Sequence, residues 1–244
     1  MAPRAPYRGP SPFLLFPAIV AAELFVGYLV ALTGIPLDDV VAPLIDTLLL
    51  AGIAIGILQL VVVAPGWLTW HEMGFRRPSL RTGSWVGSVA MGAGLAVPAL
   101  IATGIIGGIL MAILGVEAEA PVTPTFELTG FLVQLLAAGL IAPLWEETFF
   151  RGYATTAWSR TRGAKWAIVG GTLFFAAIHV PGLLGADLAT AAPKALLAFA
   201  IRVPVGFLLS WLFLSRRSLA ASMSLHVAYN AIALIVTFAA GPRP

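Results

Sequence analysis

The chain has 244 residues, of which 59% are hydrophobic and only 10% are charged, and its formal net charge is +3. A soluble domain carries about a quarter charged residues, because its surface must be solvated. The composition therefore excludes an ordinary soluble domain and indicates a protein embedded in lipid. The absence of cysteine excludes disulfides, thiolate metal sites and cysteine nucleophiles. The basic residues are scattered and form no patch, so we expect no nucleic-acid partner.

Seven apolar stretches approach or exceed the roughly 20 helical residues that a bilayer's hydrocarbon core requires. The third is rich in glycine and long for one span, which leaves an eighth span open. The sequence therefore predicts an all-α, polytopic transmembrane helix bundle in one membrane domain, 1–244, with a motif-bearing core at about 126–240. The predicted spans are Pro12–Leu32, Val41–Ala64, Ser84–Leu114, Phe126–Phe150, Lys165–Val180, Pro193–Leu214 and Leu219–Ala240.

The loops between these spans alternate in charge. Basic residues precede the first span and follow the second, fourth and sixth, whereas acidic residues follow the first, third and fifth. Because Lys and Arg concentrate on the cytoplasmic side, this alternation predicts a cytoplasmic amino terminus. Lys194 and Arg202 fall at or within the sixth span, and we interpret them as snorkelling side chains. The loop residues are Arg4, Arg8, Asp38, Asp39, Arg76, Arg77, Arg81, Glu117, Glu119, Arg151, Arg160, Arg162, Lys165, Asp187, Arg216 and Arg217.

Three predicted spans carry polar residues that are unfavourable inside a bilayer. A charged side chain near the bilayer centre costs about 2.5–3.5 kcal/mol, so it normally faces a partner or a water-filled cavity. The fourth span ends in Trp-Glu-Glu-Thr-Phe-Phe-Arg (145–151), the fifth contains Phe-Ala-Ala-Ile-His (175–179), and the seventh contains His-Val-Ala-Tyr-Asn (226–230). These three strings are the candidates for a functional site.

Helical spacing predicts how the polar residues are arranged. Residues four apart share a helix face, so Glu147 is expected to pair with Arg151, and His226 to lie beside Asn230. Glu146 points about 100° away from its neighbour around the helix axis. One carboxylate is thus neutralised by its own helix, while Glu146 has no evident local partner.

Together the three strings resemble the signature of the CAAX protease and bacteriocin-processing family of intramembrane endopeptidases, also called the abortive-infection family. The family pattern is EExxxR, then FxxxH, then HxxxN, and the resemblance covers about residues 130 to 235. It implies a metal-independent glutamate mechanism. The matching residues, in the same order, are Glu146, Glu147, Arg151, Phe175, His179, His226 and Asn230.

The resemblance implies a role for each polar residue of the three strings. Glu146 is expected to be the general base that takes a proton from water, with His179 orienting that water. His226 and Asn230 are expected to donate hydrogen bonds to the oxyanion of the tetrahedral intermediate. We interpret the glutamate–arginine pair of the first string as a structural pair that orients the site, although its glutamate can also join the catalysis. Phe175 is interpreted as core packing.

Other functions use the same residues. Glu146, His179 and His226 could form a two-histidine, one-carboxylate zinc site, although they come from three helices and no HExxH motif is present. We therefore expect no cofactor and keep zinc as an alternative. The fold could also serve as a non-catalytic scaffold or immunity factor. A proton-relay transporter also places ionisable residues within the bilayer, but no inverted repeat is detectable.

The expected partners are the lipid bilayer and a membrane-associated peptide or protein substrate. The high Ala, Gly and Arg content favours a bacterial plasma membrane, where prenylated substrates are not expected. The family resemblance then implies membrane-associated peptides, leader sequences or bacteriocin precursors as substrates. The fourth predicted span places Glu146 near its cytoplasmic end, which favours substrate access from that side or from the inner leaflet. His179 falls near the opposite end of its predicted span. The fifth helix must therefore extend beyond Val180, or the site must lie deeper in the membrane.

Overall fold

The computed structural model describes residues 6–34, 37–76, 85–118, 125–180 and 188–241, with side chains from 191 onward in the last range. Within these ranges the chain forms helices and turns and no β-strand, which confirms the all-α prediction. Among the described residues, six helices are long and apolar enough to cross a bilayer, and a shorter apolar helix accompanies them. Five loop residues used for the orientation lie outside this part of the chain: Arg4, Arg77, Arg81, Glu119 and Asp187.

The first three predicted spans and the last one agree with the observed helices to within one residue. The long third stretch is a single helix of 30 residues, so it forms one span and not two. The four helices are α1 (Pro12–Leu32), α2 (Ala42–Leu58) with its π-helical continuation η1 (Gln59–Val63), α3 (Trp85–Leu114) and α10 (Leu219–Ala240).

The predicted end of the fourth span at Phe150 is wrong, because the helix runs on to Arg162. The prediction stopped where polar residues begin, but Arg151 and every other residue of the next two turns are buried in the bundle. Arg151 is therefore an interior residue and not a loop charge. The continuous helix consists of α4 (Leu128–Leu136), η2 (Ala137–Ile141), α5 (Ala142–Glu147), η3 (Thr148–Thr155) and α6 (Thr156–Arg162), of which η2 and η3 are π-helical.

The fifth and sixth predicted spans differ from the structure at their ends. The fifth corresponds to α7 (Ala164–Ala177), which ends three residues before the predicted Val180. The sixth corresponds to two helices, α8 (Leu188–Ala200) and α9 (Val203–Arg216). Pro204 explains the break, because it cannot donate the hydrogen bond that would continue α8.

The outer surface of the bundle is apolar, as lipid exposure requires. Leu14, Leu60 and Ile113 are more than 70% exposed, at 75%, 71% and 72%. Lipid tails tolerate such side chains, whereas water would not favour so many of them. Together with the length of the helices, this surface describes an integral membrane protein.

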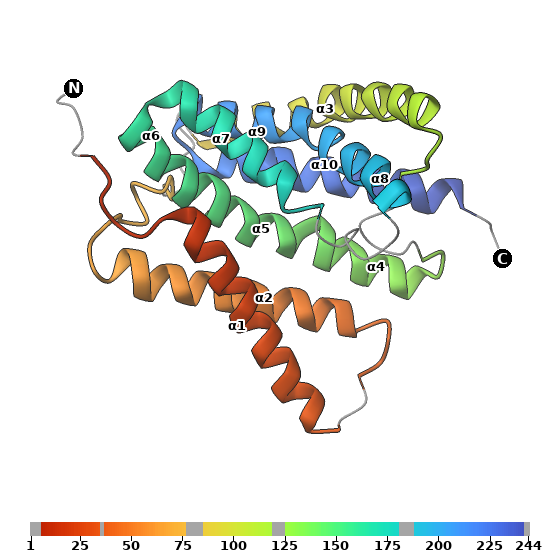
Figure 1. The fold of residues 1–244 in the computed structure, drawn as a ribbon, viewed down its shortest axis with the longest axis horizontal. Helices are drawn as coiled ribbons and strands as arrows, with labels where there is room; N and C mark the ends of the chain where they lie inside the picture. The colour runs from red at the N-terminus through yellow and green to blue at the C-terminus, as the bar shows by residue number, and fades with distance from the viewer. Residues whose placement is uncertain (1–5, 35–36, 77–84, 119–124, 181–187, 242–244) are drawn as a thin grey trace.

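Helix α10 lies inside the bundle and packs against α3, α5 and α9 (Figure 1). Its contact with α3 is very close at Gly92, where a side chain would collide with Ser224 and with the carbonyl of Ala221. The short spacing holds α10 firmly in place. Because α10 carries one of the three sequence strings, this contact helps to fix the position of the site.

One end of the bundle is wrapped by polypeptide from two other segments. Tyr153 donates a hydrogen bond of 2.6 Å to the carbonyl of Pro10, and Arg160 pairs with Glu72 at 2.6 Å. The turn between α6 and α7 lies at this end, whereas the start of α4 and the end of α10 lie at the other (Figure 1). The helix that carries the first string therefore continues beyond the start of α10, under cover of these segments.

Candidate active site

Glu147, Arg151 and His226 form a sealed polar cluster inside the bundle. The side chains of Glu147 and Arg151 have no exposed surface, and Arg151 Nη1 lies 2.9 Å from Glu147 Oε1, as the four-residue spacing predicts. The same carboxylate oxygen lies 2.9 Å from His226 Nδ1. Arg151 also lies over the Phe175 ring, with its guanidinium carbon 4.4 Å from the ring centre. Burial of the two charges is tolerable because each has a partner.

The contact with Glu147 determines which nitrogen of His226 carries the proton. An ionised carboxylate can only accept hydrogen bonds, so Nδ1 of His226 is the donor. Nε2 is then the nitrogen that can accept or release a proton. It lies 3.8 Å from Oε2 of Glu146. The two consecutive glutamates thus contact opposite nitrogens of one imidazole, and only Glu147 is sealed from the cavity.

His179 is held by a contact within its own turn. Its Nδ1 lies 2.7 Å from the carbonyl oxygen of Phe175, which can only accept, so Nδ1 is again the donor. The Phe175 ring is buried and lies edge-on to both imidazoles, 4.7 Å from the His179 ring and 5.6 Å from that of His226. The expected packing role of Phe175 therefore includes spacing the two histidines.

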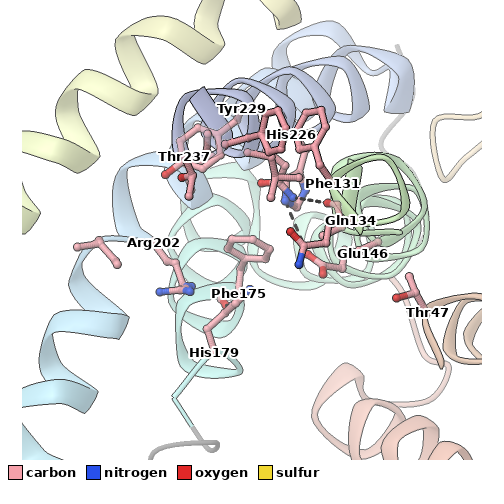
Figure 2. A pocket seen from close by; sticks show the side chains of 18 of the residues that line it. Thr47, Phe131, Gln134, Glu146, Phe175, His179, Arg202, His226, Tyr229 and Thr237 are labelled. Carbon is pink, nitrogen blue, oxygen red and sulfur yellow. Dashed lines mark hydrogen bonds and ion pairs between the residues drawn. The ribbon is translucent and has the colours of Figure 1, made fainter. Parts of the chain in front are cut away.

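A cavity of about 460 Å³ brings Glu146, His179, His226 and Asn230 together. Figure 2 shows the walls: α10 on one side, the helix of Glu146 on the next, and Phe175 with His179 opposite α10. Glu147 and Arg151 do not line this space. The lining residues are Thr47, Thr125, Phe131, Gln134, Ala138, Ala142, Glu146, Phe175, His179, Ile201, Arg202, Val205, His226, Tyr229, Asn230, Ala233, Leu234, Thr237 and Phe238.

Asn230 lies on the same face of α10 as His226, but its amide also makes a contact that the sequence did not predict. Its Nδ2 donates a hydrogen bond of 2.8 Å to the carbonyl of Ala138 in the π-helical segment η2. Continuation of the π pattern would give this carbonyl the N–H of residue 143, which is a proline without that hydrogen. Asn230 therefore replaces the hydrogen bond that Pro143 removes.

The depth of the site differs from the sequence expectation. Glu146 lies near the middle of the helix Leu128–Arg162, and not near its end. Gly163, the turn before α7, is 17 residues after Glu146 and 16 before His179, so the two antiparallel helices carry these residues to the same level. His226 follows the first residue of α10 by seven positions, or about 10 Å along the axis. The deeper of the two expected arrangements is the one observed.

Arg202 lines the cavity. Its interpretation as a snorkelling side chain, made from the sequence, did not predict this position. Arg202 occupies the break between α8 and α9, and its side chain lies beside α7, across the view from Glu146 (Figure 2). A signal was present in the sequence, because a proline two residues after an arginine within an apolar span indicates a break at that charge. Tyr229 also lines the cavity, but its hydroxyl donates to Thr103 at 3.1 Å.

The three residues of the zinc alternative do not gather as a ligand set. Glu146 approaches His226, but no group of three or more His, Cys, Asp or Glu side chains in the described part of the chain is arranged to hold a metal ion. Nδ1 of His179 and Nδ1 of His226 are both occupied by protein acceptors. Each histidine therefore presents Nε2 to the cavity, which is also the arrangement of many zinc-binding histidines.

Comparison with known families agrees with this part of the chain. Residues 128–232 match a family model described as type II CAAX prenyl endopeptidase Rce1-like. This stretch belongs to the Rce1-like family. The Rce1-like region includes all three sequence strings and every polar side chain of the cluster and cavity described above, apart from Thr47, Thr125 and Thr237. No curated protein matches the chain, and no solved structure matches it either.

The Rce1-like match confirms the family suspected from the sequence. Residues 128–232 are thus similar, at family level, to CAAX-type intramembrane proteases, and the apolar helices of the chain are those of an integral membrane protein. A protease of this family implies a membrane-associated peptide substrate and contact with the bilayer.

Proposed function

We propose that the chain is an intramembrane endopeptidase in which Glu146 activates the water that hydrolyses the peptide bond. The observation that carries the proposal is the cavity in which Glu146, His179 and His226 meet inside the bundle. In both histidines the Nδ1 atom is held by a protein acceptor, so both present Nε2 for proton exchange. Such paired fixation of tautomers is what general acid–base chemistry requires.

The hydrolysis follows from these positions. A water between Glu146 and His179 attacks the carbonyl carbon of the scissile bond and gives one proton to the Glu146 carboxylate. The carbon–oxygen bond forms, and the carbonyl electrons move to the oxygen as an oxyanion. The oxyanion then collapses, the carbon–nitrogen bond breaks, and the proton passes to the leaving amine. His226 Nε2, 3.8 Å from Glu146, is placed to share that proton.

The oxyanion needs hydrogen-bond donors already in position. Asn230 has two N–H groups on Nδ2, and the contact with Ala138 uses one of them. The second is the proposed donor. His226 is the other when its Nε2 is protonated, and Glu147 then stabilises the resulting imidazolium through Nδ1. The Glu147–Arg151 pair thus acts on the reaction through the position and charge of His226.

The substrate class is a membrane-associated peptide or protein that reaches the cavity from the bilayer. We propose that the protein lies in a bacterial plasma membrane, as its composition favours, with its amino terminus in the cytoplasm. The orientation is supported by the described basic residues Arg8, Arg76, Arg160 and Arg216, which follow the positive-inside pattern. In such a membrane, leader sequences and bacteriocin precursors are the proposed substrates. No metal is proposed for the reaction.

The deciding experiment compares the purified protein with its Glu146→Gln variant. Glutamine keeps the size of the side chain but cannot take a proton, so cleavage of membrane peptides should fall by about 100-fold to 10,000-fold. The readout is quantitative proteomics of membrane peptides from cells carrying each form, followed by cleavage of the identified peptide in detergent. A matched control is Glu127→Gln, an exposed glutamate outside the cavity.

Three results would contradict the proposal. Wild-type cleavage by Glu146→Gln removes the glutamate mechanism, and an unchanged biological function without any cleavage favours a scaffold. Thermal unfolding of both variants separates these results from misfolding. Loss of cleavage on exhaustive chelation, restored by zinc, would instead favour the metal alternative.

A further inference from the structure

Arg202 is a cation that faces the cavity from the wall opposite Glu146 (Figure 2). The structure pairs the buried Glu147 with Arg151 and pairs Glu72 with Arg160. By contrast, it gives Arg202 no carboxylate partner among the residues that it describes. The hydrogen bond of its guanidinium runs from Nη1 to the carbonyl of Ala198, at 2.9 Å. An arginine within a membrane span normally requires an anion or a wet cavity.

The break between α8 and α9 fixes this arginine in place. The N–H of Ile201 reaches the carbonyl of Leu197, whereas the N–H of Arg202 reaches that of Phe199. The carbonyl of Ala198 is thereby skipped, and it accepts the arginine's own Nη1–H. The arginine is therefore held by the backbone of the preceding turn, and its other guanidinium N–H groups are left for a partner in the cavity that it lines.

A hydrogen-bond chain from two other helices supports the same turn. The Tyr229 hydroxyl of α10 donates to Thr103 of α3 at 3.1 Å, and Thr103 donates to the carbonyl of Ile201 at 3.2 Å. The residue before Arg202 is thus tied to the helix that carries His226. This arrangement fixes the distance between the cation and the proposed catalytic residues.

The charges of the cavity indicate what Arg202 binds. Glu147 and Arg151 neutralise each other, which leaves Glu146 and Arg202 within electrostatic range across the open space. In the proposed reaction Glu146 takes a proton and loses its charge. Arg202 then faces the cavity as a cation, and an anionic group on the substrate would balance it. An oxyanion forms beside Glu146, whereas Arg202 lies on the other wall, so the anion must belong to another part of the substrate.

We propose that Arg202 is a specificity-determining residue that binds a carboxylate of the peptide substrate, while the scissile bond lies beside Glu146. A guanidinium presents several N–H donors in one plane, which suits a carboxylate. The carboxylate is either the carboxyl terminus of the peptide or an acidic side chain near the cleaved bond. This inference rests on the proposed function of the same cavity.

Binding can be measured without cleavage in the Glu146→Gln background. The probe is a fluorescent, farnesylated peptide that ends in a CAAX sequence without acidic side chains. Its prenyl group supplies the membrane association that the proposed substrates share, and the matched family is described as a CAAX prenyl endopeptidase. The readout is fluorescence anisotropy. We expect Arg202→Gln to weaken its binding by about 10-fold or more, because a charge-assisted hydrogen bond is lost. Arg202→Lys should restore part of the affinity. The matched control is Arg162→Gln, at the exposed end of α6.

Two modified peptides identify the source of the carboxylate. If Arg202 binds the carboxyl terminus, the peptide with an amidated carboxyl terminus should bind about 10-fold more weakly to Glu146→Gln, the parent variant. Adding Arg202→Gln should then cause no further loss of affinity for this peptide. If an acidic side chain is bound, an amidated peptide with one glutamate should recover the affinity and the dependence on Arg202. Equal affinities of all peptides for the parent and Arg202→Gln, or no binding of any of them, would overturn the inference.

Cleavage by the otherwise wild-type protein separates this inference from the proposed function. If Arg202 binds a carboxylate, Arg202→Gln should raise KM far more than it lowers kcat for the peptide that carries the bound carboxylate. For the amidated peptide without a glutamate, both KM and kcat should stay unchanged. An equal loss of kcat for both peptides would show a role in the reaction itself and contradict the carboxylate site. Cleavage that requires Glu146 but not Arg202 would leave the proposed function intact. Binding that depends on Arg202, without any cleavage, would support the carboxylate site and contradict the proposed function.

Discussion

Glu146 and Glu147 are consecutive residues of one helix, yet they have opposite environments. Glu147 has no exposed surface and accepts from both Arg151 and His226. Glu146 keeps 14% of its side-chain surface, lines the cavity and meets His226 only at 3.8 Å. The difference shows that two neighbouring carboxylates of one helix can be distinguished by their partners, one closed off by charged neighbours and the other open to the cavity. A charge with close partners is held in place, and its partners cannot be removed without cost, whereas a charge with a distant partner remains available for reaction.

The largest effect is expected when the sealed cluster loses its cation. Arg151→Met leaves Glu147 buried without its main partner, which should lower the free energy of unfolding by about 3–5 kcal/mol. Unfolding in detergent, followed by helical circular dichroism, measures this loss. The double variant Glu147→Met, Arg151→Met should recover much of the stability but none of the activity, because His226 loses its anchor.

Glu146→Gln is the matched comparison for Arg151→Met, since it changes a residue of the same helix that faces the cavity. It should unfold at the wild-type temperature or above it. A destabilisation of Glu146→Gln as large as that of Arg151→Met would remove the distinction between the two carboxylates.

The contact between α3 and α10 should show the next effect in size. Gly92→Ala would place a methyl group against Ser224 and the carbonyl of Ala221. Such overpacking should cost about 1–3 kcal/mol and shift His226 away from the two glutamates. Gly87→Ala is the control, because a methyl group added there would have no neighbour within 4 Å. Equal unfolding temperatures and activities of the two variants would show that this spacing does not control the site.

Asn230 belongs to both environments, because it lines the cavity and also satisfies the carbonyl of Ala138. Asn230→Ala should cost only about 1 kcal/mol of stability, as is typical for one interhelical hydrogen bond in a membrane. Activity should fall about 100-fold, because the proposed oxyanion donor is lost. Thr237→Ala, which changes another cavity residue of α10, is the control. A loss of activity no larger than that of Thr237→Ala would assign Asn230 to the fold alone.

The smallest effect is expected at Glu72–Arg160, an ion pair of the same chemistry at the covered end of the bundle. Burial raises the pKa of Glu72, but hydrogen bonds from Arg160 and Thr69 outweigh it and place the pKa below its ordinary value. The pair therefore contributes above the unfolded pKa of about 4.3, and this contribution is lost as the pH falls through the folded value.

A comparison of two variants measures this pH dependence. Glu72→Gln should be less stable than wild type at pH 7 by under about 1 kcal/mol, because the pair is partly exposed. The difference should persist down to about pH 4 and shrink as the pH falls further, through the lowered folded pKa of Glu72. Glu117→Gln, which changes an exposed residue, serves as control. A difference that grows in acid would contradict the lowered pKa.

The fold was largely predictable because lipid imposes a simple rule on sequence. Apolar length alone determined α1 and α10 to the residue, and helical spacing predicted the pair of Glu147 and Arg151. The rule failed where polar residues are buried by protein and not exposed to water. For this reason the helix of Glu146 was expected to end at Phe150, and Arg202 was expected to snorkel.

The sequence by itself determined that this is a helical membrane protein and which strings could carry chemistry, since hydropathy and spacing are local properties of the chain. Only the tertiary structure decided which side of His226 faces each glutamate, that Asn230 replaces the hydrogen bond removed at Pro143, and that Arg202 points into the cavity. These features depend on contacts between helices that are far apart in sequence. Their geometry is set by the packing of α3, α7, α9 and α10 around the Leu128–Arg162 helix.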